Sequence, residues 1–169
     1  IARAHAVMTS VGQVPIVVKR ELDGFILNRL QGALLSEAMR LVGEGYVSPQ
    51  DLDKTVQDGL GLRWSFLGPF ATIELNAPGG VADYCARYAG FYRALAANPP
   101  SAGVWDADRV QNVTRQLEPP PTPDERDARM RWRDLRLLAL RRHKVNEPDS
   151  DELRARARNE SESNAPDSK

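Results

Sequence analysis

The chain contains one short segment typical of a buried β-strand and no convincing second one. Val14–Val18 (VPIVV) is almost continuously apolar, as in strands covered on both faces of a sheet. It follows a helical pattern over Ala2–Val11 and a turn at Gly12-Gln13. A lone strand cannot satisfy its own backbone hydrogen-bonding groups, so its partners must come from elsewhere. We therefore interpret residues 1–20 as the last helix-strand unit of a parallel sheet whose other strands precede Ile1.

From Asp23 to Lys144 the apolar spacing and the capping residues predict a mainly α domain. Asp23 can cap the first helix, which ends at about Gly43. The stretch Ser48-Pro49-Gln50-Asp51 is a strong helix start, with a serine cap, a proline at the first position and an acid at the third. The helices are expected at about residues 23–43, 48–58, 65–76 with a new start at Pro69, 80–97, 106–117 and 124–144.

The composition narrows the class of protein. The chain has 169 residues, with 23 basic side chains balancing 23 acidic ones, which is untypical of a protein that binds nucleic acid or a membrane surface. It contains no apolar run of about 18 residues and no signal peptide at its start, so we expect a cytoplasmic location. Cys85 is the only cysteine, which excludes an internal disulfide, and we expect it to be a small packed residue.

Two segments lie outside this helical pattern. Pro119–Pro123 (PPPTP) is predicted to be a stiff, extended linker before the last helix. Residues 145–169 contain almost no large apolar side chain and are predicted to be a disordered tail. The predicted organisation is thus a sheet-derived segment over 1–20, a helical domain over 21–144 and a tail.

Asn28 is an unexpected polar residue within the first long helix. At about 100° per residue it projects between Leu35 and Met39 on the apolar face, whereas Arg29 projects onto the polar face beside Arg40. Gly32, one turn later, leaves space beside the amide. A buried amide without partners costs a few kcal/mol, so two interpretations stay open. Asn28 either ties the helix to a neighbouring loop in the core or contacts a ligand.

Several motifs together resemble a known family. GFILNRL at residues 24–30, followed by SPQDLD at 48–53 and GPF at 68–70, is similar to the C-terminal domain of the 3-hydroxyacyl-CoA dehydrogenase family. The resemblance is greatest to the branch of lambda-crystallin and L-gulonate 3-dehydrogenase, and it extends loosely to RMRWRDLRLLAL at 129–140. It implies a helical domain of the 6-phosphogluconate dehydrogenase C-terminal type. Such a domain follows an NAD-binding Rossmann domain and forms most of a homodimer interface.

The resemblance implies a division of the active site between two domains. In this family hydride passes from the carbon that bears a 3-hydroxyl to NAD, while a histidine paired with a glutamate takes the proton. Those residues belong to the first domain, so neither His5 nor His143 is assigned a catalytic role. The GLGL stretch at Gly59–Leu62 lacks the spacing of a dinucleotide-binding turn. Asn28 matches the asparagine that orients the histidine and the substrate oxygen.

A second candidate site residue is Arg63 in GLGLRW. Relatives that act on free hydroxy acids resemble this Leu-Arg-Trp pattern, and a guanidinium binds a carboxylate through a planar, bidentate fork. Arg63 would then hold the substrate carboxylate while Trp64 forms an apolar wall. The alternative is a salt bridge at the surface or at an interface.

The arginine-rich segment before the tail is better explained by packing than by nucleic acid. Acidic residues alternate with its arginines, and Met130, Leu137, Leu138 and Leu140 give it an apolar face. In the family this segment packs against the partner subunit, so we expect a homodimer that binds neither nucleic acid nor a membrane. A different function stays open: a helical dimerisation module, or a structural protein such as a crystallin, without catalysis.

Overall fold

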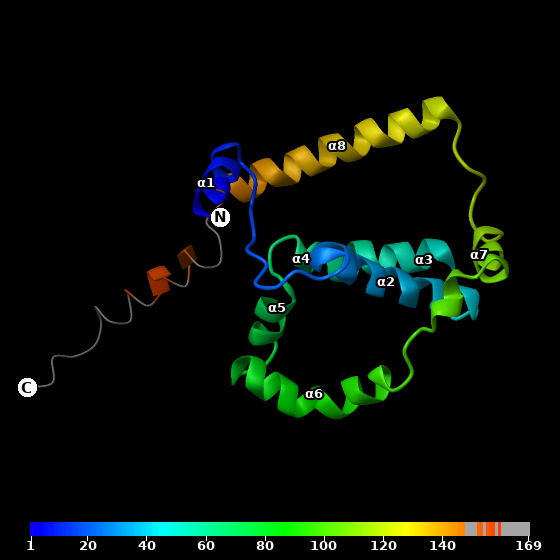
Figure 1. Cartoon of the computed structure of the whole chain (residues 1–169), viewed down its shortest axis with the longest axis horizontal. Coiled ribbons are helices and arrows are strands. Elements are labelled where there is room, and N and C mark those ends of the chain that lie inside the picture. The colour runs from blue at the N-terminus through cyan, green and yellow to red at the C-terminus, as the bar shows by residue number, and fades with distance from the viewer. Residues whose placement is uncertain (148–151, 154, 158, 160–169) are drawn as a thin grey trace, which may run out of the picture.

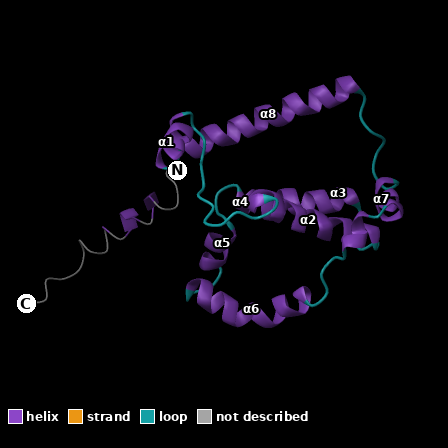
Figure 2. Cartoon of the chain, in the orientation of Figure 1, coloured by secondary structure: helices purple, strands orange, loops and turns teal. Residues whose placement is uncertain are grey.

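The structure of the protein is a computed structural model, which describes residues 1–147, 152, 153, 155–157 and 159. In these residues the regular structure is helical, and no strand occurs (Figure 1 and Figure 2). The predicted mainly α class is therefore confirmed. No helix in this described part is both long enough and apolar enough to span a bilayer.

The N-terminal segment forms a helix but not the predicted strand. Helix α1 spans Ala2–Ser10, as expected from its pattern. Residues 14–18 have no regular structure, and Val14 is 92% exposed. No described segment supplies the backbone partners that a strand requires, and the prediction assigns those partners to residues outside the described part, so the strand stays a prediction. The origin of residues 1–20 in a Rossmann sheet stays a prediction.

Helix α2 spans Phe25–Gly43 and begins differently from the prediction. Its N-cap is Gly24, at φ 77°, and Phe25 follows at φ 48°. Asp23 lies before this left-handed turn and does not cap the helix, because no side chain bonds to the first turn. Glycine is favoured at such a φ since it has no Cβ.

The next helix begins as predicted but runs further. Ser48 caps α3 (Pro49–Lys54), and its Oγ accepts a hydrogen bond of 3.1 Å from the Asp51 backbone nitrogen. The predicted end near Asp58-Gly59 is wrong. The chain continues as the π-helix η1 (Thr55–Gly61) and then as α4 (Leu62–Trp64).

The remaining α-helices follow the predicted order. They are α5 (Pro69–Leu75), α6 (Gly80–Ala96), α7 (Ala107–Thr114) and α8 (Pro123–Asn146), and the 3-10 helix η2 (Ala102–Trp105), which was not predicted, precedes α7. Thr122 and Glu125 form a reciprocal capping box at the start of α8, one helical position before the predicted start. Most of the predicted tail lies outside the described residues.

The small core lies where α2 meets η2 and α7. Val42, Val104 and Val113 are buried there, and the Trp105 Nε1 donates to Ser36 Oγ at 3.2 Å. Asn112 Nδ2 donates to the Gly43 carbonyl oxygen at 3.0 Å. These contacts fix the C-terminal end of α2.

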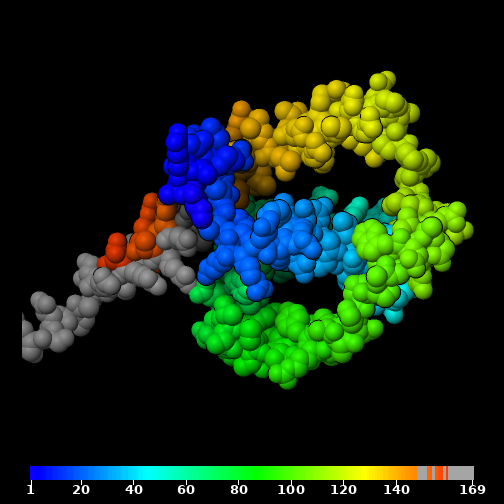
Figure 3. All heavy atoms as spheres, in the orientation of Figure 1, coloured from blue at the N-terminus to red at the C-terminus, as the bar shows by residue number. Residues whose placement is uncertain are grey.

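Helix α8 extends as an arm beside this core rather than packing over it. Figure 3 shows open space between α8 and the central helices even with all heavy atoms drawn. Its C-terminal end contacts the rest of the chain through a hydrogen bond from Arg141 Nη2 to the Gly12 carbonyl oxygen and an edge-on ring contact between His143 and Phe66. Much of its apolar surface is therefore exposed, including Leu135 and Leu137 at 68% and 57%.

Candidate functional site

An antiparallel pair of helices brings the two candidate site residues to the same end of the fold. Figure 1 shows α2 beside the continuous α3–η1–α4 segment, running in the opposite direction. The groove between them, of about 380 Å³, is lined by Leu34 and Leu41 from α2 and by Leu52, Val56 and Leu60 from the second segment.

The position of the two residues follows from helix geometry. Asn28 lies about 9 Å beyond Leu34 towards the start of α2, at 1.5 Å per residue. Arg63 lies about 5 Å beyond Leu60 in the same direction in space, because the two segments run antiparallel. Both residues therefore belong to the end of the helix pair that is distant from the Val42 core.

The Asn28 side chain is exposed, and its amide makes no hydrogen bond with any described residue. Its apolar neighbours Leu27 and Leu30 are also exposed, at 75% and 63%. Asn28 was predicted to project on the apolar side of its helix. It is nevertheless not a core residue, because no other described part of the chain covers that part of α2. The interpretation as a core asparagine tied to a loop is thus wrong for this chain. A Cβ added at Gly32 would meet nothing within 4 Å, which confirms the predicted space.

Arg63 is exposed as well, and its guanidinium makes no ion pair or hydrogen bond within the described part of the chain. Trp64 beside it is 43% exposed. The salt bridge that would explain Arg63 within one chain is not formed. Its cation is left available to an anion from outside the chain.

Arg40, which has a structural role, differs from Arg63 because its guanidinium is paired within the chain. It pairs with two acids on its own helix: Arg40 Nε donates to Glu37 Oε2 at 2.9 Å, and Arg40 Nη1 lies 3.6 Å from Glu44 Oε2. The hydrogen bond from Arg40 lowers the pKa of the Glu37 carboxyl. These two acids satisfy the guanidinium of Arg40. The guanidinium of Arg63 has no such acid beside it in the described part of the chain.

The two histidines have ordinary local contacts. His5 Nδ1 lies 3.5 Å from Thr9 Oγ1 within α1, and the His143 ring meets Phe66 with centroids 5.8 Å apart. The described residues contain no group of three or more histidine, cysteine or acidic side chains placed to hold a metal ion. Gly59–Leu62 is helical and so does not form the strand-to-helix turn that binds a dinucleotide.

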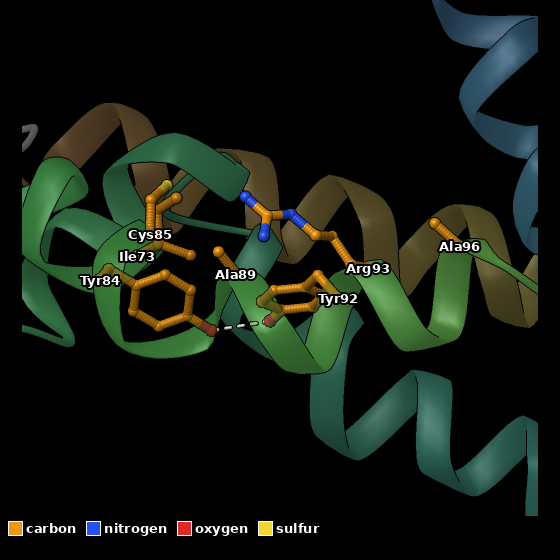
Figure 4. Close-up of a pocket in the computed structure, with 7 residues that line it drawn as sticks. All are labelled: Ile73, Tyr84, Cys85, Ala89, Tyr92, Arg93 and Ala96. Atoms are coloured by element: carbon orange, nitrogen blue, oxygen red, sulfur yellow. Dashed lines mark hydrogen bonds between the residues drawn. The ribbon is translucent and has the colours of Figure 1, made fainter.

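Cys85 lines a separate cavity of about 450 Å³ on α5 and α6 (Figure 4). The prediction that it is a packed residue is wrong, because Cys85 is exposed. Tyr84 and Tyr92 share a hydrogen bond of 2.7 Å between their hydroxyl oxygens, and the Arg93 side chain lines the same cavity. The tyrosine pair was not predicted, although its spacing of eight residues places both rings on one face of α6.

Comparison with known proteins identifies the family. The model described as "3-hydroxyacyl-CoA dehydrogenase, C-terminal domain" matches residues 24–116, which include Asn28, Arg63 and the whole helix pair. The chain belongs to the 3-hydroxyacyl-CoA dehydrogenase family. The resemblance predicted from the GFILNRL, SPQDLD and GPF motifs is confirmed.

Members of this dehydrogenase family align over different lengths. The chain is 43% identical to rabbit (Oryctolagus cuniculus) lambda-crystallin over 147 residues, covering 84% of this chain and 46% of the relative. A 3-hydroxyacyl-CoA dehydrogenase of Gibberella moniliformis is 46% identical over 78 residues, or 46% of this chain and 24% of the relative. An L-carnitine dehydrogenase of Oceanobacillus iheyensis is 40% identical over 73 residues, covering 43% and 24%. The chain thus spans less than half the length of these relatives.

Proposed function

We propose that this chain supplies the substrate-closing half of a dehydrogenase that oxidises the 3-hydroxyl of a hydroxy acid or acyl-CoA to a 3-keto group. The observation that carries the proposal is the joint position of Asn28 and Arg63. A hydrogen-bonding amide and a cation, both exposed and without partners in the described part of the chain, belong to one end of an antiparallel helix pair. In this proposal the amide binds the hydroxyl oxygen of the substrate and the cation binds its carboxylate.

In this proposal Asn28 orients rather than transfers a proton. A neutral amide has no accessible pKa, so it can donate to the reacting oxygen or accept from a catalytic histidine but cannot serve as a base. Its exposure allows both groups to come from a second domain that closes against α2. The open space at Gly32 leaves room for that approach.

The cofactor in this proposal is NAD, which accepts the hydride and is bound mainly by a domain outside the described residues. No turn with the phosphate-binding pattern occurs in this part of the chain, so its residues do not form that site. The histidine and glutamate that move the proton are assigned to the same outside domain.

A free carboxylic acid is the preferred substrate class. Arg63 offers an unpaired planar cation for a carboxylate, and Trp64 offers an apolar surface beside it. The similarity to an L-carnitine dehydrogenase favours the same class, since carnitine is a hydroxy acid with a free carboxylate. The similarity to a 3-hydroxyacyl-CoA dehydrogenase keeps a CoA thioester as the alternative substrate.

We also propose that the functional unit is a homodimer formed through the helical domain. Support comes from the apolar side chains that one chain leaves exposed on α8, including Met130, Leu137 and Leu138 at 44%, 57% and 44%. A second copy that covers them would bury surface that is otherwise costly in water.

A second candidate function is structural rather than catalytic. Relatives aligned over 84% and 82% of this chain are named lambda-crystallin and lambda-crystallin homolog, which favours a role that needs only the stable helical fold. The two functions differ in a simple way. A structural protein does not need Asn28 or Arg63 to bind a small molecule.

The test is the Arg63→Lys variant of the full-length protein, assayed for NADH formation with short 3-hydroxy acids and with their CoA thioesters. Lysine keeps the charge but loses the bidentate fork, so we expect KM for free acids to rise by about tenfold or more. Arg109→Lys on α7, distant in sequence from the proposed site, is the matched control. Unchanged affinity and turnover in Arg63→Lys would overturn the role of Arg63. Absence of NADH formation with every acid would favour the structural function.

A further inference from the structure

The π-helix η1 lies directly between α3 and the candidate substrate arginine. It spans Thr55–Gly61, and Arg63 follows after a single residue, Leu62. π-helices are rare and occur frequently at functional sites. The side of the helix on which Arg63 projects therefore depends on this turn.

The effect of the turn can be worked out from helix geometry. Backbone hydrogen bonds in a π-helix run from residue i to i+5, so the turn holds about one residue more than an α-turn. Each residue of an α-helix advances by about 100° around the axis. A straight α-helix from Lys54 would therefore point Arg63 about 100° away from its present direction. The direction of α3 itself is fixed by the Ser48 cap and by Leu52, which lines the groove with α2.

Gly61 lies at the end of this turn, close to the backbone of Val56. Its dihedral angles, φ −63° and ψ −40°, are those of an ordinary helix, so its backbone conformation does not require glycine. A Cβ at this position would instead lie 3.0 Å from the Val56 carbonyl oxygen, five residues earlier, which is too close for an ordinary contact. A Cβ at Gly59, in the same π-helix, would meet nothing within 4 Å. The restriction is therefore specific to Gly61.

We propose that Gly61 is a positioning residue that maintains the π-turn and thereby points the Arg63 guanidinium at the substrate carboxylate. This inference rests on the proposed function, in which Arg63 binds that carboxylate. Gly61 touches neither substrate nor cofactor and acts only through the direction of Arg63. The π-turn is thus a determinant of specificity for free acids.

The test begins with Gly61→Ala in the full-length enzyme, assayed with 3-hydroxybutyrate and with its methyl ester. Alanine crowds the Val56 carbonyl oxygen and favours an α-turn, which rotates Arg63 away. We expect KM for the acid to rise by about tenfold while kcat changes by less than about twofold. The reason is that the contact between Arg63 and the carboxylate is equally strong in the bound substrate and in the transition state, so its loss weakens binding without slowing the reaction. KM for the ester, which has no carboxylate, should not change. Gly59→Ala is the matched control and should keep wild-type values for both compounds.

A compensating deletion separates positioning from a folding defect. Removal of the exposed residue Asp58 from the Gly61→Ala variant takes out the extra residue of the π-turn. The segment can then close as an ordinary α-helix with Arg63 in its original direction. We expect the double variant to recover wild-type KM for the acid, and this recovery also tests the idea if Gly61→Ala alone does not fold. A double variant that folds but retains the raised KM would overturn the inference.

Failure of the positioning role of Gly61 can be distinguished from failure of the proposed function. If Arg63→Lys leaves KM for the acid unchanged, both the proposed role of Arg63 and the positioning role of Gly61 are overturned. If Arg63→Lys raises KM but Gly61→Ala does not, only the positioning role of Gly61 is overturned. Equal effects of Gly61→Ala and Gly59→Ala would likewise overturn it, because only Gly61 is crowded in the π-turn.

Discussion

Asn28→Ala should change catalysis and stability in opposite directions. The Asn28 side chain is exposed and has no hydrogen-bond partner in the described residues, so its removal leaves no buried group unsatisfied. Alanine is the better helix former, and the substitution within α2 should raise the free energy of unfolding of this chain by up to about 0.5 kcal/mol. A core asparagine tied to a loop would instead cost about 1–3 kcal/mol when removed.

The catalytic effect of the same substitution should be large. Loss of one oriented hydrogen bond to a reacting oxygen lowers the rate by about 100-fold or more, equivalent to about 2.7 kcal/mol. We would measure urea unfolding of the chain and kcat/KM of the full-length enzyme in parallel. Gln31→Ala, which removes another exposed amide from α2, is the control and should leave kcat/KM unchanged. Equal losses of stability and activity in Asn28→Ala would refute the reasoning.

Two further predictions concern pH and assembly. The pKa of Glu37 is lowered by its hydrogen bond from Arg40, so its charge stabilises the fold above the ordinary carboxyl pKa, and this contribution is lost as the pH falls through the lowered value. Urea unfolding between about pH 5 and pH 3 should therefore show a steeper loss of stability for the wild type than for Glu37→Gln, and parallel curves would contradict this. Leu137→Asp places a charge on the exposed apolar surface of α8 and should shift a dimer towards monomer in sedimentation velocity, with Arg142→Ala as the control. A dimer that survives Leu137→Asp would exclude that surface from the interface.

Helix starts were the most predictable part of this fold because capping chemistry is local. Ser48 and Pro49 begin α3, and Pro69 begins α5, at the residues that their side chains favour. The start of α2 was less predictable. A left-handed glycine followed by Phe25 at positive φ has no strong sequence signal, so Asp23 was the more plausible cap.

The π-turn could not be predicted from apolar spacing. Leu52, Val56 and Leu60 recur every fourth residue, which is compatible with an uninterrupted helix. Gly59 and Gly61 suggested that the helix ends, whereas they lie inside a turn that accommodates small residues. The switch from i+4 to i+5 hydrogen bonds is not visible in the apolar spacing, because the close approach of Gly61 to the Val56 carbonyl oxygen exists only in the folded backbone.

The exposure of the site residues also lay beyond sequence reasoning. Periodicity correctly places Asn28 among leucines, but it does not say whether this chain or another covers that face. The same limit applies to Cys85, which was expected to be buried and is exposed. The apolar run at Val14–Val18 likewise remains without backbone partners in the described residues.

The most direct test of the central claim is the position of Asn28 relative to a bound substrate. We would determine a crystal structure of the full-length protein with NAD and 3-hydroxybutyrate. We expect the Asn28 side-chain amide to lie within about 3.2 Å of the substrate hydroxyl oxygen or of the catalytic histidine. We also expect the substrate carboxylate to lie against Arg63. An Asn28 that still faces solvent, with the acid bound elsewhere, would overturn the proposed role of this residue.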